Sequence, residues 1–167
     1  MDGACFNVCS GEIEVMRANS GDVLYALYSS VRNHLLTTLP PNVLAEFGDR
    51  VYAEAAPDVM TESDKNLPLL IMHELGGQPQ PIFGDVGCNE VVRMQLAIWV
   101  PRAIGLENPL RWRGAVWDAL DDADIRVDVI GYEHKAVARR VAYACELSED
   151  WWNLTSDYDL FVGMIEV

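Results

Sequence analysis

The stretch EVVRMQLAIWV, residues 90–100, decides the fold class because apolar and polar side chains alternate along it. In an extended chain, successive side chains point to opposite faces, so one face here is apolar and the other is mixed. The apolar face carries Val92, Met94, Leu96, Ile98 and Val100. Arg93, Gln95 and Ala97 point to the other face, and Pro101 ends the pattern. We predict a long β-strand with one face on the core.

Two further strands are predicted on the N-terminal side of this stretch. Residues 69–75 form a dense apolar run that is typical of a central strand, and residues 49–54 suggest a shorter strand. Residues 57–68 are polar and read as a loop. Residues 76–89 contain four glycines and two prolines, so we expect a long loop there.

The C-terminal side carries more strand patterns. Residues 125–129 alternate, and residues 159–167 read as a last strand. Residues 136–147 fit two patterns, because their alanines favour a helix and their alternation favours a strand. The alternating residues are Val141, Tyr143, Cys145 and Leu147. We favour the strand for this stretch, and we expect a turn or a single helical turn over residues 149–155.

Two amphipathic helices are predicted between these strands. Ser20 is a suitable N-cap for the first, whose apolar residues recur every four positions until two prolines stop it. The recurring residues are Val23, Leu27, Val31 and Leu35, and the prolines are Pro40 and Pro41. The second main helix begins at Asn108-Pro109, a cap followed by proline, and extends to about residue 123. A short helical piece over residues 42–47, ended by Gly48, follows the first.

Runs of strands broken by two helices indicate an α+β fold. We therefore predict a largely antiparallel mixed sheet with two main helices packed on one face. The chain has 167 residues, a length that fits a single domain with a substantial core. We expect residues 1–19 to form an N-terminal arm and residues 20–167 to form one α+β domain.

The charge of the chain limits its partners. Twelve basic residues stand against 26 acidic ones, which gives a net charge of −14. Such a charge disfavours binding to phosphate backbones and to anionic lipid surfaces. It serves either as a means of solubility or as an acidic wall along which DNA slides without sticking. No apolar run approaches the roughly 20 residues of a membrane span, and no secretory signal is visible, so we expect a cytoplasmic protein without a membrane partner.

No motif for a catalytic, cofactor or metal site is present in the sequence. Walker, GxGxxG, GxSxG and HExxH patterns are all missing, and the three histidines lie on three different predicted elements. The four cysteines do not have zinc-site spacing, so we expect free, mostly buried thiols. An acidic run near the end of the second helix reads as a solvated rim rather than a cation site: Asp118, Asp121, Asp122 and Asp124. We predict that the chain is not an enzyme and needs no cofactor.

Two groups of apolar residues are candidates for an interface with another protein. Trp151 and Trp152 are adjacent, so on any regular element they point in different directions, and one of them is free to meet a partner. The second group lies in the predicted long loop: Pro79, Pro81, Ile82 and Phe83. Long loops in compact domains are usually functional. The alternative for both groups is packing within the chain itself.

The order of short apolar signatures resembles a known family. Arg50-Val51-Tyr52 follows the first helix and precedes an alanine–proline turn and a proline-led apolar strand. A long strand ending in Ile98-Trp99-Val100 then precedes a helix with the sequence AVWDAL, residues 115–120. This order, over residues 22–147, resembles the tail-terminator and tail-completion proteins of long-tailed bacteriophages. The N-terminal arm and residues 150–167 depart from the resemblance.

The resemblance implies a structural virion protein without catalytic residues. It implies a homo-oligomeric ring, typically a hexamer, that caps the head-proximal end of the tail tube and stops tube polymerisation. Its partners are then the tail tube protein and the head connector or another neck protein, and DNA passes through the lumen without specific binding. The protein would occupy the host cytoplasm during assembly and the virion tail afterwards.

Three other readings remain open at this point. Another neck or head–tail connector adaptor would show much the same sequence. An acidic DNA-mimic inhibitor fits the net charge, although arginines scattered along the chain interrupt a continuous acidic face. A small enzyme would need His, Asp or Cys side chains that converge in a deep pocket.

Overall fold

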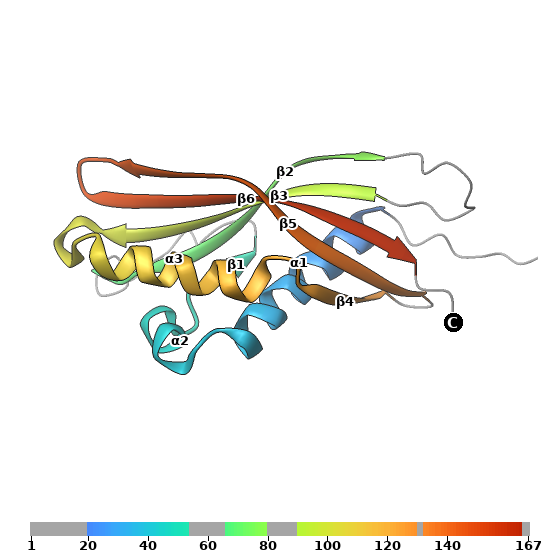
Figure 1. Ribbon diagram of the computed structural model, residues 1–167, viewed down its shortest axis with the longest axis horizontal. Helices are drawn as coiled ribbons and strands as arrows, with labels where there is room; N and C mark the ends of the chain where they lie inside the picture. Colours follow the sequence, from blue (N-terminus) through green and yellow to red (C-terminus); the bar gives the residue numbers. More distant parts are fainter. Residues whose placement is uncertain (1–19, 54–65, 80–89, 130–131, 165–167) are drawn as a thin grey trace, which may run out of the picture.

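The computed structural model shows a strongly twisted six-stranded sheet with three α-helices on one side of it (Figure 1). The structure describes residues 20–53, 66–79, 90–129 and 132–164. Along the sheet the order is β1-β2-β3-β6-β5-β4. The strands are β1 (Val51–Ala53), β2 (Leu69–Pro79), β3 (Glu90–Pro101), β4 (Asp124–Val129), β5 (Tyr132–Leu147) and β6 (Trp151–Met164). The helices are α1 (Ser20–Thr38), α2 (Pro41–Phe47) and α3 (Glu107–Leu120), with a 3-10 turn η2 (Arg102–Ile104).

The predicted fold class is confirmed. All neighbouring strands are antiparallel except β1 and β2, which are parallel. The two main helices, α1 and α3, lie on the same side of the sheet (Figure 1). Residues 136–147 are strand rather than helix, because they pair with β6 along their whole length. Within the described ranges, no helix has the length and apolar character that a membrane crossing requires.

Besides shifts at the ends of β1 and at the start of β5, three boundaries differ from the prediction. β2 continues to Pro79, so residues 76–79 belong to a strand and not to the predicted loop. The pairing of β2 with β3 continues past a bulge between Glu74 and Gly76, so the two glycines that follow Leu75 remain in the strand. α3 begins at Glu107, ahead of the predicted Asn108 cap, because the first turn of a helix leaves N–H groups unbonded and so tolerates Pro109.

The third difference concerns residues 149–155, where we expected a turn. The turn is confined to residues 148–150, and β6 starts at Trp151. The backbone N–H of Ser148 donates to the Trp151 carbonyl at 2.9 Å, and the Trp151 N–H donates to Ser148 Oγ at 3.2 Å, which closes the hairpin between β5 and β6. The alternation of β6 was hard to recognise because Ser156, a polar residue, occupies a core position and is 2% exposed.

The core lies between the sheet and the helices. Its helix contribution is the stripe predicted for α1, of which Leu27, Val31 and Leu35 are at most 1% exposed. Its sheet contribution is the predicted apolar face of β3, from Val92 to Val100, with the matching residues of β6. Leu39, Val43 and Phe47 extend the same cluster through α2, where Phe47 meets Trp112 of α3 edge-on at 5.7 Å.

Helix α1 contacts both edge strands of the sheet, β1 and β4, as well as α3. Two polar side chains reinforce these contacts. Arg32 Nε donates to the Val51 carbonyl of β1 at 2.9 Å, and His34 Nε2 lies 2.9 Å from the Ala119 carbonyl near the end of α3. The sheet therefore curls around α1, and the helix fills the space between its two edges.

We predict that Leu35→Ala lowers the free energy of unfolding by about 2–5 kcal/mol, because it leaves a cavity between α1 and the sheet. Tyr25→Ala on the same helix is the matched control, since Tyr25 is 74% exposed. Its expected effect is within about 0.5 kcal/mol. Urea unfolding of both variants checks this, and equal losses would contradict the placement of α1.

Candidate assembly interface

The two tryptophans at the start of β6 point to opposite faces of the sheet. Trp152 pairs with Val100 and Leu147 and packs against the core on the helix side. Trp151 pairs with Pro101 and therefore faces the side away from the helices. The two tryptophans therefore point in different directions, as predicted, and Trp151 is the one directed away from the core.

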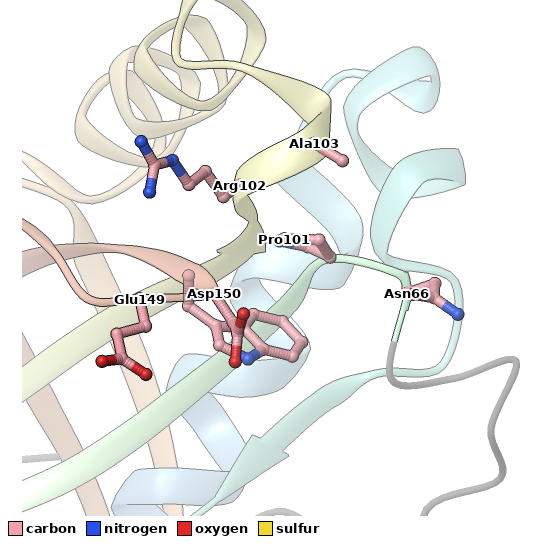
Figure 2. A pocket seen from close by; sticks show the side chains of 7 residues that line it. Asn66, Pro101, Arg102, Ala103, Glu149 and Asp150 are labelled. Atoms are coloured by element: carbon pink, nitrogen blue, oxygen red, sulfur yellow. The ribbon is translucent and has the colours of Figure 1, made fainter.

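Trp151 is one of the residues that line an open hollow at the end of the sheet. Figure 2 shows this hollow with its other lining residues labelled. The hollow has a volume of about 590 Å³ and is lined by Asn66, Pro101, Arg102, Ala103, Glu149 and Asp150 besides Trp151. Two of its lining residues are joined by a hydrogen bond from the Arg102 N–H to the Asp150 carbonyl, at 2.8 Å. The hollow thus places an indole beside charged side chains of both signs.

The other predicted interface residues lie at or beyond the end of β2. Pro79 is the last residue of β2, where its backbone lies opposite Glu90. Pro81, Ile82 and Phe83 lie outside the described residues. The structure therefore brings the two tryptophans together at one end of β6, and it places Pro79 on a different strand.

A group of stacked cations and aromatic rings joins α3 to β5. The guanidinium carbon of Arg140 lies 3.7 Å from the centre of the Trp117 ring, and that of Arg113 lies 4.8 Å from it. Arg113 also lies 5.3 Å from the Tyr143 ring and donates to the Ala144 carbonyl at 3.0 Å. Cation–π contacts of this kind are stronger when they are partly shielded from water.

Trp117, which belongs to this group, and Tyr158 of β6 are each hydrogen-bonded to a polar side chain. Trp117 Nε1 donates to Ser156 Oγ at 2.8 Å, which accounts for the buried serine of β6. The Tyr158 hydroxyl donates to Asp121 at 3.2 Å, and Arg140 pairs with the same carboxylate at 2.9 Å. Burial first, and then the negative charge and hydrogen bond of Asp121, raise the pKa of Tyr158 well above its usual value, and the Arg140 cation opposes this.

The acidic run at the end of α3 is exposed to solvent, and most of its carboxylates also pair with cations of β5. Asp122 lies 3.9 Å from Arg139, and Asp124 pairs with Lys135. Together with Asp121, which pairs with Arg140, three of the four carboxylates thus join this segment to β5. Among the described residues, no group of His, Cys, Asp or Glu side chains is arranged to hold a metal ion.

Sequence reasoning missed the stacked group and these ion pairs. The signal was present as opposite charge: four aspartates at residues 118–124 precede a lysine and two arginines at residues 135–140. The prediction of buried thiols was wrong for Cys145, which is exposed on β5. Cys5, Cys9 and Cys88 lie outside the described residues.

The fold is shared with a protein of known structure. A chain from a structure described as "Virion of native gene transfer agent (GTA) particle" superposes with a TM-score of 0.62 and 17% sequence identity. The match covers 84% of this chain and 97% of that chain. At this identity the likeness shows a common fold. No protein-family model and no curated protein sequence matches the chain.

We predict different effects for alanine at the two tryptophans. Trp152→Ala removes an indole that packs on the core, so the free energy of unfolding should fall by about 2 kcal/mol or more. Trp151→Ala removes a side chain from the rim of the hollow and should cost less than about 1 kcal/mol. Urea unfolding measures both, and a larger loss for Trp151→Ala would show that the core-facing tryptophan has been misassigned.

We also predict a pH dependence that belongs to Tyr158. An unfolded tyrosine loses its proton near pH ~10, whereas the folded protein retains it because its pKa is raised. The resulting stability is complete below pH ~10 and is lost as the pH rises from there towards the folded pKa, by at most roughly 1.4 kcal/mol per pH unit. Tyr158→Phe should show a shallower decline in unfolding free energy between pH ~9 and ~11. Equal slopes for the two proteins would contradict the raised pKa.

Proposed function

We propose that this protein is a structural component of a virion, and specifically a tail terminator: a ring of six identical subunits that caps the tail tube. The observation that carries the proposal is the shared fold with a chain of the gene transfer agent virion, matched over nearly all of that chain. The order of helix and strand signatures in the sequence, which resembles that of tail-terminator proteins, supports the finer assignment. The predicted domain, residues 20–167, would be the ring-forming unit.

In this role the protein ends tube polymerisation and offers its outer surface to the head connector. The tail tube protein and the neck proteins would be its partners in the host cytoplasm, and the tail would be its place in the virion. A net charge of −14 would let DNA pass the ring without adhering to it. No step of this role requires catalysis or a cofactor.

The charge arrangement supports this role over that of a DNA mimic. A mimic requires a continuous acidic face, whereas exposed cations neutralise neighbouring carboxylates across the sheet. Arg93 makes a two-pronged contact with Asp159, at 2.7 and 3.1 Å, on the side away from the helices. Lys135 and Arg139 of β5 likewise pair with carboxylates of the acidic run, so cations and carboxylates also lie side by side along β4 and β5.

We predict that the purified protein forms closed rings of about six times the 18.6 kDa chain mass, alone at high concentration or on the tip of its tail tube. Light scattering over a concentration series and negative-stain imaging check this. When the protein is added to polymerising tail tube protein, the tubes should be shorter, and the added protein should be bound at one end of each tube.

Tubes that lengthen unchanged, without bound protein at their ends, would contradict the terminator role. Binding to the connector together with indifference to the tube would point instead to another neck adaptor.

A further inference from the structure

Strand β5 extends well past its neighbour β4. The register between them ends where Asp124 meets Val137, and the backbone of Ala138 is bonded to Asp122 and Ala123. From residue 139 to residue 147, β5 pairs with β6 on one side and with no second strand of the described part on the other. We call these nine residues, 139–147, the open edge of β5.

Charged side chains and bulges usually keep a strand from pairing with another chain, and the open edge has them only at its start and at Glu146. It contains no proline, and its single bulge lies at its start, between Arg140 and Ala142. It exposes three apolar side chains: Val141 at 48%, Tyr143 at 63% and Leu147 at 47%. Long apolar edges of this kind are normally covered, either by the same chain or by another one.

The opposite side of the sheet offers a second edge. β1 covers only Leu70–Met72 of β2, so residues 74–79 pair with β3 on one side and with no other strand of the described part. Leu75 at the bulge is 49% exposed, and Glu74 beside it is also exposed. Pro79 at the end of this stretch fits an edge position, since proline cannot donate to a neighbouring strand.

We propose that the open edge of β5 in one copy of the chain binds residues 74–78 of β2 in a second copy. We infer a parallel pairing of the two edges, because it places Arg139, whose side chain is 66% exposed, opposite the exposed Glu74. Arg140 contributes less, since it already pairs with Asp121 and stacks on Trp117. The exposed leucine of β2 would meet the exposed apolar side chains of β5. Each copy then has one edge of each kind, so the contact is head-to-tail and repeats until it closes into a ring. This inference rests on the proposed ring and assigns its subunit contact.

Cross-linking tests the contact between the start of the open edge and Leu75, which are neighbours in the parallel pairing. In a background with all four cysteines replaced by serine, Val141→Cys and Leu75→Cys supply the two thiols, since these positions are 48% and 49% exposed. A short flexible bismaleimide should then join subunits into a ladder that ends at the ring number. Leu110→Cys in place of Leu75→Cys is the matched control, because Leu110 is 42% exposed and belongs to α3 rather than to a strand edge. It should give at least about fivefold less ladder.

The outcomes separate this inference from the ring itself. Closed rings with no Leu75-dependent ladder, or with an equal ladder from Leu110→Cys, would overturn the edge contact and leave the ring intact. Dimers linked through Val141→Cys without Leu75→Cys would show that β5 meets β5, which also overturns it. A ladder without an upper limit and without closed rings would support the edge contact and contradict the ring. A monomer at every concentration, with no ladder even on tube tips, would overturn both.

A charge placed on the open edge gives a second test that does not depend on cysteine geometry. Val141→Lys should weaken self-association on the order of tenfold, because a lysine on a strand edge opposes pairing. Leu110→Lys is the control, and circular dichroism verifies that both variants fold. Equal association by the two variants would overturn the proposal.

Discussion

The rest of the structure depends on the position of α1 between the two edges of the sheet. Its buried stripe packs on the sheet, and its polar side chains reach β1 and the end of α3, so one helix bonds to elements that are far apart in the sequence. A twisted sheet with helices on one face can curl until its edges approach the same helix. Because α1 contacts both edge strands, it sets how far the sheet curls.

The α3 side of the sheet is held by polar and aromatic contacts rather than by apolar packing alone. Trp117 is hydrogen-bonded to the buried Ser156 and stacked on two arginines, and Tyr158 shares Asp121 with Arg140. Partners that are satisfied in this way define one packing of α3 on β5 and β6. They fix the position of the long β5–β6 hairpin where it continues past Asp124, the first residue of β4. A rigid, exposed strand is better suited to bind a second chain than a loop, because little conformational entropy is lost on binding.

Much of this architecture was visible in the sequence. The alternation of residues 90–100, the stripe of α1 and the strand character of residues 136–147 identified an α+β fold with helices on one face. Strand β6 was placed too late, because Ser156 interrupts its apolar alternation and its hydrogen bond to Trp117 is a tertiary contact. The ion pairs between the acidic run and β5 also needed the fold, since they join residues on either side of β4. The adjacent tryptophans were recognised as a divided pair, but only the register with β3 showed that Trp151 faces away from the core. Which edges are open follows from strand lengths, which local patterns do not determine.

Hydrogen–deuterium exchange on the free and the assembled protein tests the central claim most directly, since it reports on the backbone of both edges at once. The account predicts that assembly slows exchange at the amides of residues 139–147 and of residues 74–78, while the solvent face of α3 around Leu110 exchanges as before. Assembly that leaves both edges unprotected, and protects the helices instead, would contradict it.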